Sequence, residues 1–120
     1  MLSIDDIVRL YYEDVSIEFL KRRSNGIMGE WDYPRVLIYE NNLRSEEERD
    51  ITLLHEFIHA RDEVIRGIDQ KMGEMDEYGC TNYEEVEKEA FETYQNAPEV
   101  LVLLKELYNI KSQSKPLKTL

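Results

Sequence analysis

The spacing of apolar residues along the chain predicts a series of short elements. Apolar residues recur at helical intervals over residues 4–12, and Ser3 stands just before them as a helix cap. Apolar and polar residues alternate over residues 15–20 and, more weakly, over 27–31, and residues 36–39 form an apolar run. Turn-forming residues separate these three segments. We therefore expect one helix followed by a small three-stranded antiparallel sheet.

The rest of the chain is predicted to be mainly helical. Ser45 and Glu48 form a capping box, and Gly67 is of the residue type that commonly ends a helix. Residues 67–82 show no periodicity and are expected to form a loop. The apolar periodicity predicts three further helices, which cover about residues 45–66, 82–95 and 99–110. The expected fold class is α+β, with the sheet packed against three or four helices.

The length of 120 residues is that of a single domain. We expect residues 1–110 to form one compact domain and residues 111–120 to form a flexible basic tail, because that tail contains three lysines and no acid. The net charge is −11, from 26 acidic and 15 basic residues. This balance excludes nucleic acid as a partner, because nucleic-acid binding depends on Lys and Arg that neutralise phosphates.

The sequence lacks the marks of secretion and of membrane insertion. Its first residues are acidic where a signal peptide needs a basic region, and no apolar run approaches the roughly 20 residues of a membrane helix. The single cysteine, Cys80, excludes a disulfide framework. We expect a cytoplasmic protein without a membrane partner, and the sequence gives no indication of its oligomeric state.

The pattern His55-Glu56-Phe57-Ile58-His59 carries the chemistry of the chain. Residues four apart share one face of a helix, so both imidazoles can bind the same ion, and Glu56 then lies beside it as a base. The chain has only two histidines, so its third metal ligand must be a carboxylate or Cys80. The alternative is that both histidines are ordinary residues on a helix face.

The next helix offers several glutamates as the third ligand. Its apolar stripe runs through Tyr83, Val86 and Ala90, and Glu87 falls inside that stripe. A carboxylate in an apolar stripe must be paired, protonated or bound to a metal. We therefore predict Glu87 as the third ligand, with Glu84 as the next choice.

These motifs resemble those of a known family. The His55–His59 pattern, followed by Glu87-Lys88-Glu89-Ala90, looks like the gluzincins, which are zinc metallopeptidases with two histidines on one helix and a glutamate on the next. The short sheet before the first motif is similar to that of the minimal single-domain members, the minigluzincins. The resemblance covers about residues 15–95.

The resemblance implies a zinc ion between the two helices, held by His55, His59 and Glu87, with Glu56 as the catalytic base. The family often has Asp or Asn after the alanine to orient a ligand histidine, whereas this chain has Phe91. We expect Asp62 to take that orienting role. The family also uses an edge strand ahead of the first motif to pair with substrate backbone, and here residues 36–39 occupy that position.

The predicted function is zinc-dependent hydrolysis of peptide bonds in peptide or protein substrates. We further expect the basic tail to lie in or near the acidic cleft and to restrain activity. One alternative is a zinc-stabilised regulatory or protein-binding domain with little turnover. Another is a helical interaction module whose acidic surface meets a basic partner.

Overall fold

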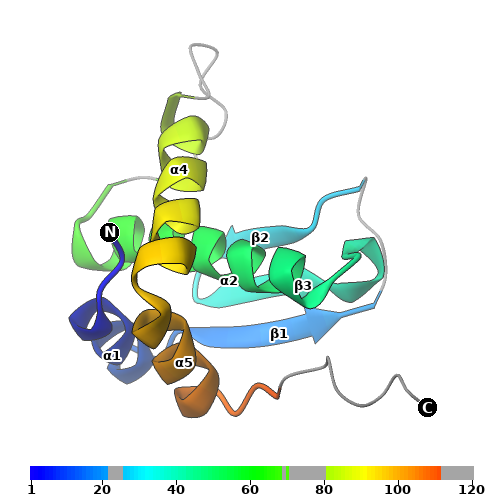
Figure 1. The fold of residues 1–120 in the computed structure, drawn as a ribbon. Coiled ribbons are helices and arrows are strands. Elements are labelled where there is room, and N and C mark those ends of the chain that lie inside the picture. The colour runs from blue at the N-terminus through cyan, green and yellow to red at the C-terminus, as the bar shows by residue number, and fades with distance from the viewer. Residues whose placement is uncertain (22–25, 69, 71–80, 112–120) are drawn as a thin grey trace.

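The computed structural model describes residues 1–21, 26–68, 70 and 81–111. Within them the fold is α+β, with a three-stranded sheet and four α-helices, as the sequence predicts (Figure 1). The elements in chain order are α1 (Ile4–Tyr12), β1 (Ser16–Leu20), β2 (Gly29–Asp32), β3 (Arg35–Tyr39), the 3-10 turn η1 (Glu40–Asn42), α2 (Glu46–Ala60), the π-helical turn η2 (Arg61–Ile65), α4 (Thr81–Asn96) and α5 (Pro98–Leu107).

The helix starts follow the predicted capping residues. The hydroxyl of Ser3 accepts from the backbone N–H of Asp6, and the carboxylate of Asp6 accepts in return from the N–H of Ser3. Ser45 caps α2 through the N–H of Glu48. Each cap satisfies a backbone donor that a helix start leaves without an intrahelical partner. Gly67, at φ 73°, ends the helical segment in the left-handed conformation that favours glycine.

The prediction of an antiparallel sheet is wrong, because the sheet is mixed. Its strand order is β1-β3-β2, with β3 antiparallel to β2 and parallel to β1. The most apolar strand takes the central place, and Val36, Leu37, Ile38 and Tyr39 are all buried there. The flanking strands β1 and β2 carry acidic residues, Glu18 in β1 and Glu30 and Asp32 in β2, which places charged side chains on the edge strands.

The strand order also shows that the expectation of an edge strand at residues 36–39 is wrong. Residues 36–39 lie in the centre of the sheet and have a hydrogen-bonded strand on both sides. The edge strand that contacts α2 is β2. Among the described residues no strand pairs with its outer side, so the outer backbone groups of β2, rather than those of β3, are available there for a further strand.

The core lies between the sheet and the helices, with α2 across one sheet face and α1, α4 and α5 around it (Figure 1). Phe57 and Ile58, which lie between the two histidines in the sequence of α2, are fully buried in this core. No helix in the described residues is both long and apolar enough to cross a membrane. Most of the predicted loop over 67–82 lies outside the described residues, and its last two residues already belong to α4. The predicted tail over 111–120, with its proposed restraint on activity, lies outside them except for Lys111.

A buried ion-pair network ties the end of α2 to α4. Arg61 is 1% exposed and donates to the carboxylates of Asp62 and Glu89. Burial acts to raise the pKa of Glu89, but the hydrogen bonds and the charge of Arg61 outweigh it and hold that pKa below its ordinary value. The network fixes α4, and therefore Glu87, relative to α2.

Substituting Glu89→Gln should destabilise the protein by about 2 kcal/mol at neutral pH, because the buried guanidinium of Arg61 loses one of its two carboxylate partners and keeps only Asp62. A carboxyl whose pKa is lowered by folding stabilises the protein above its unfolded pKa, and this contribution disappears as the pH falls through the folded pKa. Urea unfolding between pH 3 and 7 should therefore show a smaller loss of stability on acidification for Glu89→Gln. Glu85→Gln, an exposed change on the same helix, is the control.

Candidate metal centre

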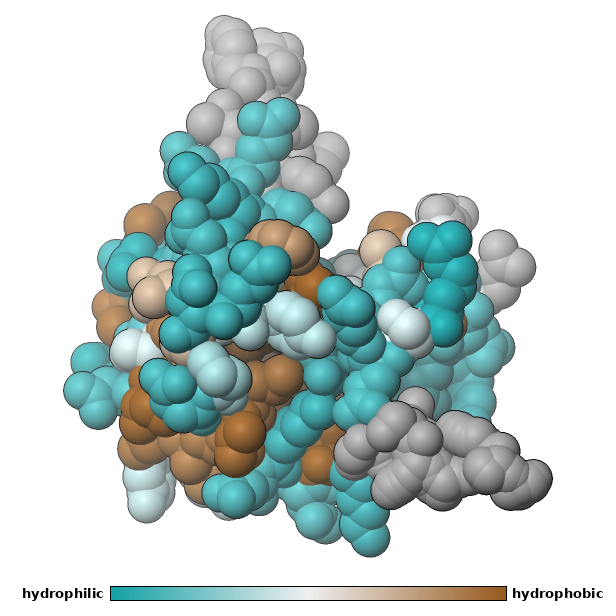
Figure 2. Space-filling model, viewed as in Figure 1, coloured by the Kyte–Doolittle hydropathy of each residue, from teal (hydrophilic) through white to brown (hydrophobic). Residues whose placement is uncertain are grey.

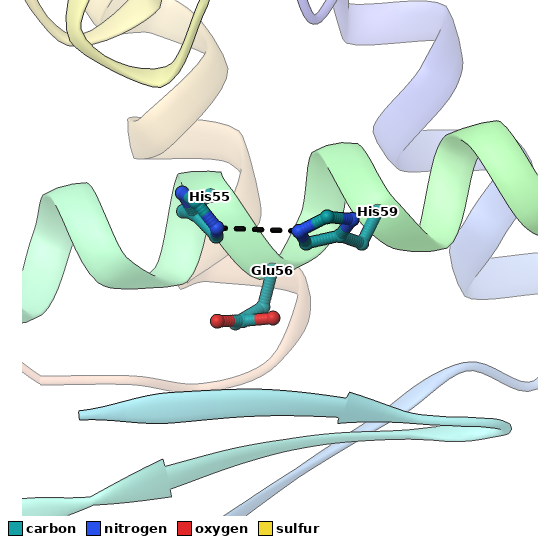
Figure 3. A group of neighbouring side chains, drawn as sticks. All are labelled: His55, Glu56 and His59. Atoms are coloured by element: carbon teal, nitrogen blue, oxygen red, sulfur yellow. Dashed lines mark hydrogen bonds between the residues drawn. The ribbon is translucent and has the colours of Figure 1, made fainter. Parts of the chain in front are cut away.

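The His-Glu-His group lies within one turn and a half of α2 and is buried. His55, Glu56 and His59 are 7%, 6% and 0% exposed. One ligand atom from each residue can be chosen so that all three lie within 4.8 Å of one another. The two imidazoles turn toward each other, and their Nε2 atoms are 3.2 Å apart (Figure 3). The predicted sharing of one helix face is confirmed.

Polar contacts at Nδ1 orient both rings. The amide nitrogen of Gln70 donates to the carbonyl of Ile68, so its oxygen, 2.6 Å from Nδ1 of His59, accepts a proton held there. On the other ring, a carboxylate oxygen of Glu87 lies 2.7 Å from Nδ1 of His55 and can only accept. Acceptors therefore face Nδ1 of both rings, and a hydrogen bond joins the two Nε2 atoms.

A metal ion bound by both rings would take the place of the proton in this hydrogen bond. Two nitrogen ligands on a tetrahedral zinc ion, each at about 2.0–2.1 Å, are about 3.3 Å apart. The observed separation of 3.2 Å agrees with that geometry. The donor set, with imidazoles and a carboxylate, is also the one that zinc prefers. The residues present therefore fit a zinc ion.

The structure brings the predicted ligand Glu87 to this centre, but on an unexpected side. Its carboxylate contacts Nδ1 of His55, while Nε2 of that ring faces His59. The Glu87 side chain faces α2, as its helical phase predicts, but it is 50% exposed rather than buried. In this position Glu87 orients His55, and its direct binding to zinc stays a prediction. Glu84 is exposed, and Cys80 lies outside the described residues.

The hydrogen bond from His55, partly opposed by burial, lowers the pKa of Glu87. Glu87 is therefore a carboxylate at neutral pH, as both the orienting role and a ligand role require.

Gln70, and not Asp62, orients His59. Asp62 is buried, but its carboxylate accepts from Arg61 and Arg66. Gln70 is 2% exposed and its oxygen sits on Nδ1 of His59. No sequence pattern points to this residue, because Gln70 lies in a segment without apolar periodicity and amides are common on surfaces.

Substituting Gln70→Ala should weaken zinc binding by about 10- to 100-fold, because partners that orient a ligand histidine typically contribute that much. Competition with a chromophoric chelator measures the affinity. Gln95→Ala, which removes an exposed glutamine from α4, should leave the affinity unchanged. Equal affinities for the two variants would contradict the role assigned to Gln70.

Glu56 extends from α2 toward the strands (Figure 3) and packs against Gly29 of β2. A Cβ at Gly29 would stand 2.6 Å from Cγ2 of Thr52 and 3.2 Å from Oε2 of Glu56. The indole N–H of Trp31 also donates to Glu63 at 2.9 Å, so β2 is fastened to the helical segment at two points. Glycine at position 29 therefore lets the edge strand approach the base closely.

Substituting Gly29→Ala should destabilise the protein by about 1–3 kcal/mol, because the added methyl overpacks the contact with Thr52. Part of this cost should disappear in a Thr52→Ser background, which removes Cγ2 and keeps the hydroxyl that donates to the Glu48 carbonyl. A double-mutant cycle of urea unfolding free energies measures this coupling. Additive free energies would contradict the close approach.

A pocket of about 280 Å³ opens beside the centre. His55, Glu56 and Glu87 contribute its polar wall, and Ile51 and Thr52 of α2 and residues 26–29 complete it. Figure 2 shows the surface hollowed between α4 and the segment that leads into β2. The centre therefore has a route to solvent, which a closed structural zinc site lacks.

Comparisons of the chain with protein-family models, with curated proteins and with solved structures found no match. We therefore infer the function from the geometry of the site.

Proposed function

We propose that the protein is a zinc-dependent metallopeptidase. The observation that carries this proposal is the pair of Nε2 atoms at 3.2 Å with the carboxylate of Glu56 on the same turn. The open pocket supports a catalytic role over a structural one, since a structural site is normally closed by protein ligands. A purely structural site would also have no use for a buried base beside the ion.

His55 and His59 would hold the ion through Nε2, and Glu87 and Gln70 keep both rings oriented through Nδ1. When bound, zinc would polarise the scissile carbonyl and lower the pKa of water. Glu56 would act as the base, taking a proton from the attacking water and returning it to the leaving amine. Its burial at 6% exposure excludes most competing solvent from this transfer.

The surroundings of the pocket suit an extended peptide. Within the described residues, β2 pairs on one side with β3, and its other side remains available for a substrate strand. The pocket wall includes the side chains of Ile27, Met28 and Ile51. Ile27 and Met28 are 42% and 38% exposed, so they offer apolar surface to a ligand. We expect an apolar substrate side chain next to the bond that is cleaved.

The test is cleavage of an internally quenched peptide library by the zinc-loaded protein. Cleavage should stop when a chelator removes the zinc and should return when zinc is restored. Zinc binding without cleavage of any library member would overturn the hydrolytic proposal and would instead support a zinc-stabilised binding domain.

A further inference from the structure

A second hollow lies where the end of α1 meets the end of α5, and aromatic rings line it. Its volume is about 400 Å³, and its walls include Tyr11 and Tyr12 from α1 and Tyr108 from the C-cap of α5. Asp14, Val15 and Ser16 complete the lining. None of these residues lines the pocket at the metal centre. Figure 1 shows the two helices next to each other, and Figure 2 shows hydrophobic residues gathered over them.

The ring of Tyr11 stands at a steep angle to the rings of Tyr12 and Tyr108. The ring centroids of Tyr11 and Tyr12 are 5.8 Å apart with an interplanar angle of 77°, and those of Tyr11 and Tyr108 are 5.3 Å apart at 82°. Nearly perpendicular rings form corners whose walls are aromatic faces. The face of an aromatic ring attracts a cation within about 6 Å of the ring centroid.

The innermost wall of the hollow is already in place. The hydroxyl of Tyr108 donates to the carbonyl of Val15 at 2.7 Å, and its ring packs against Phe57 in the core. Burial and the neighbouring Tyr11 raise the pKa of Tyr108, so its ring stays neutral. Tyr12, in contrast, is 78% exposed. This exposure leaves a large ring beside the hollow that the packing of the core does not require.

The charge around the hollow favours a cation. Asp14 contributes a carboxylate to the wall, and no lysine or arginine is among the described residues that line it. The hollow lies at the C-terminal end of α1, where the helix dipole is negative. The chain as a whole carries a net charge of −11.

From this combination we infer that Tyr11, Tyr12, Tyr108 and Asp14 form a binding site for a methylated ammonium group. The rings would contact the methyl groups and Asp14 would balance the charge, as in other aromatic recognition of quaternary ammonium ions. This site does not depend on the metal centre or on the proposed hydrolysis.

The test is titration of the full chain with choline and with its neutral carbon analogue 3,3-dimethylbutan-1-ol, followed by NMR of the tyrosine rings. Choline should bind about tenfold more tightly, because only its charge interacts with the ring faces and Asp14. A peptide with trimethyl-lysine and the same peptide with unmodified lysine form a second arm. Preference for the trimethylated peptide over choline would identify a protein side chain as the source of the group.

Matched variants locate the site. Tyr12→Ala should weaken choline binding by about tenfold, and Asp14→Asn by about threefold, since asparagine tolerates the positive φ of 66° at this position. Tyr33→Ala, which removes a 61% exposed tyrosine elsewhere, should change nothing. Equal binding of choline and its neutral analogue, or equal effects of Tyr12→Ala and Tyr33→Ala, would overturn the inference.

Discussion

Replacing Glu56 by glutamine should abolish peptide cleavage while the protein keeps its zinc. Glutamine has nearly the same size as glutamate, so it fits the packed position against Gly29. Its amide accepts no proton at neutral pH, and positioned acid–base groups typically contribute about 10²- to 10⁴-fold to a rate. We therefore expect a loss of at least about 100-fold in kcat. The measurement pairs a cleavage assay with zinc analysis of the same sample.

The matched control for this variant is Glu47→Gln. Glu47 lies on the same helix, α2, and is exposed, so its substitution makes the same change in charge away from the pocket. Cleavage by Glu47→Gln should equal that of the parent protein. If Glu56→Gln also cleaves at the parent rate, Glu56 is not the base and the proposed mechanism fails.

His59→Ala should bring the second large effect, which is the loss of zinc binding. His59 is fully buried, and its Nε2 is one of the two atoms that fit the ion. Zinc bound by a few protein ligands gains about 10–16 kcal/mol, so removal of one ligand should weaken binding by about a thousandfold or more. Zinc affinity measured by chelator competition should show this loss directly.

Thermal unfolding provides an independent readout of the same variant. Zinc at a hundredfold excess over its dissociation constant should stabilise the parent by about 2.7 kcal/mol, and this shift should disappear in His59→Ala. Comparing melting temperatures with and without zinc within each variant cancels the packing cost of the substitution. An equal zinc-induced shift in both proteins would show that His59 does not bind the ion.

The local parts of the fold could be predicted because short-range chemistry determines them. Ser3 and Ser45 begin helices as expected, since each cap is formed by residues three positions apart. The spacing of His55 and His59 likewise fixes which helix face they share. In contrast, the position of β3 between β1 and β2 depends on pairing between distant segments. The turn-forming residues Asn25-Gly26 indicate a turn after the first strand, but they do not specify which strand pairs with which.

The contacts of the two histidines could likewise be predicted only in part. The sequence pointed to Glu87 as a member of the centre, but a helical phase cannot specify which ring nitrogen a half-exposed carboxylate reaches. Asp62 occupies a suitable helical position, yet the buried Arg61 engages its carboxylate. Gln70 then fills the place beside His59. Competition among charged neighbours decides these contacts, and that competition appears only in three dimensions.

Elemental analysis of protein purified without added metal is the most direct test of whether His55 and His59 hold a zinc ion. We expect about one zinc per chain, retained through purification and removed by a strong chelator. Protein that contains no zinc, and whose melting temperature does not change when zinc is added, would contradict it.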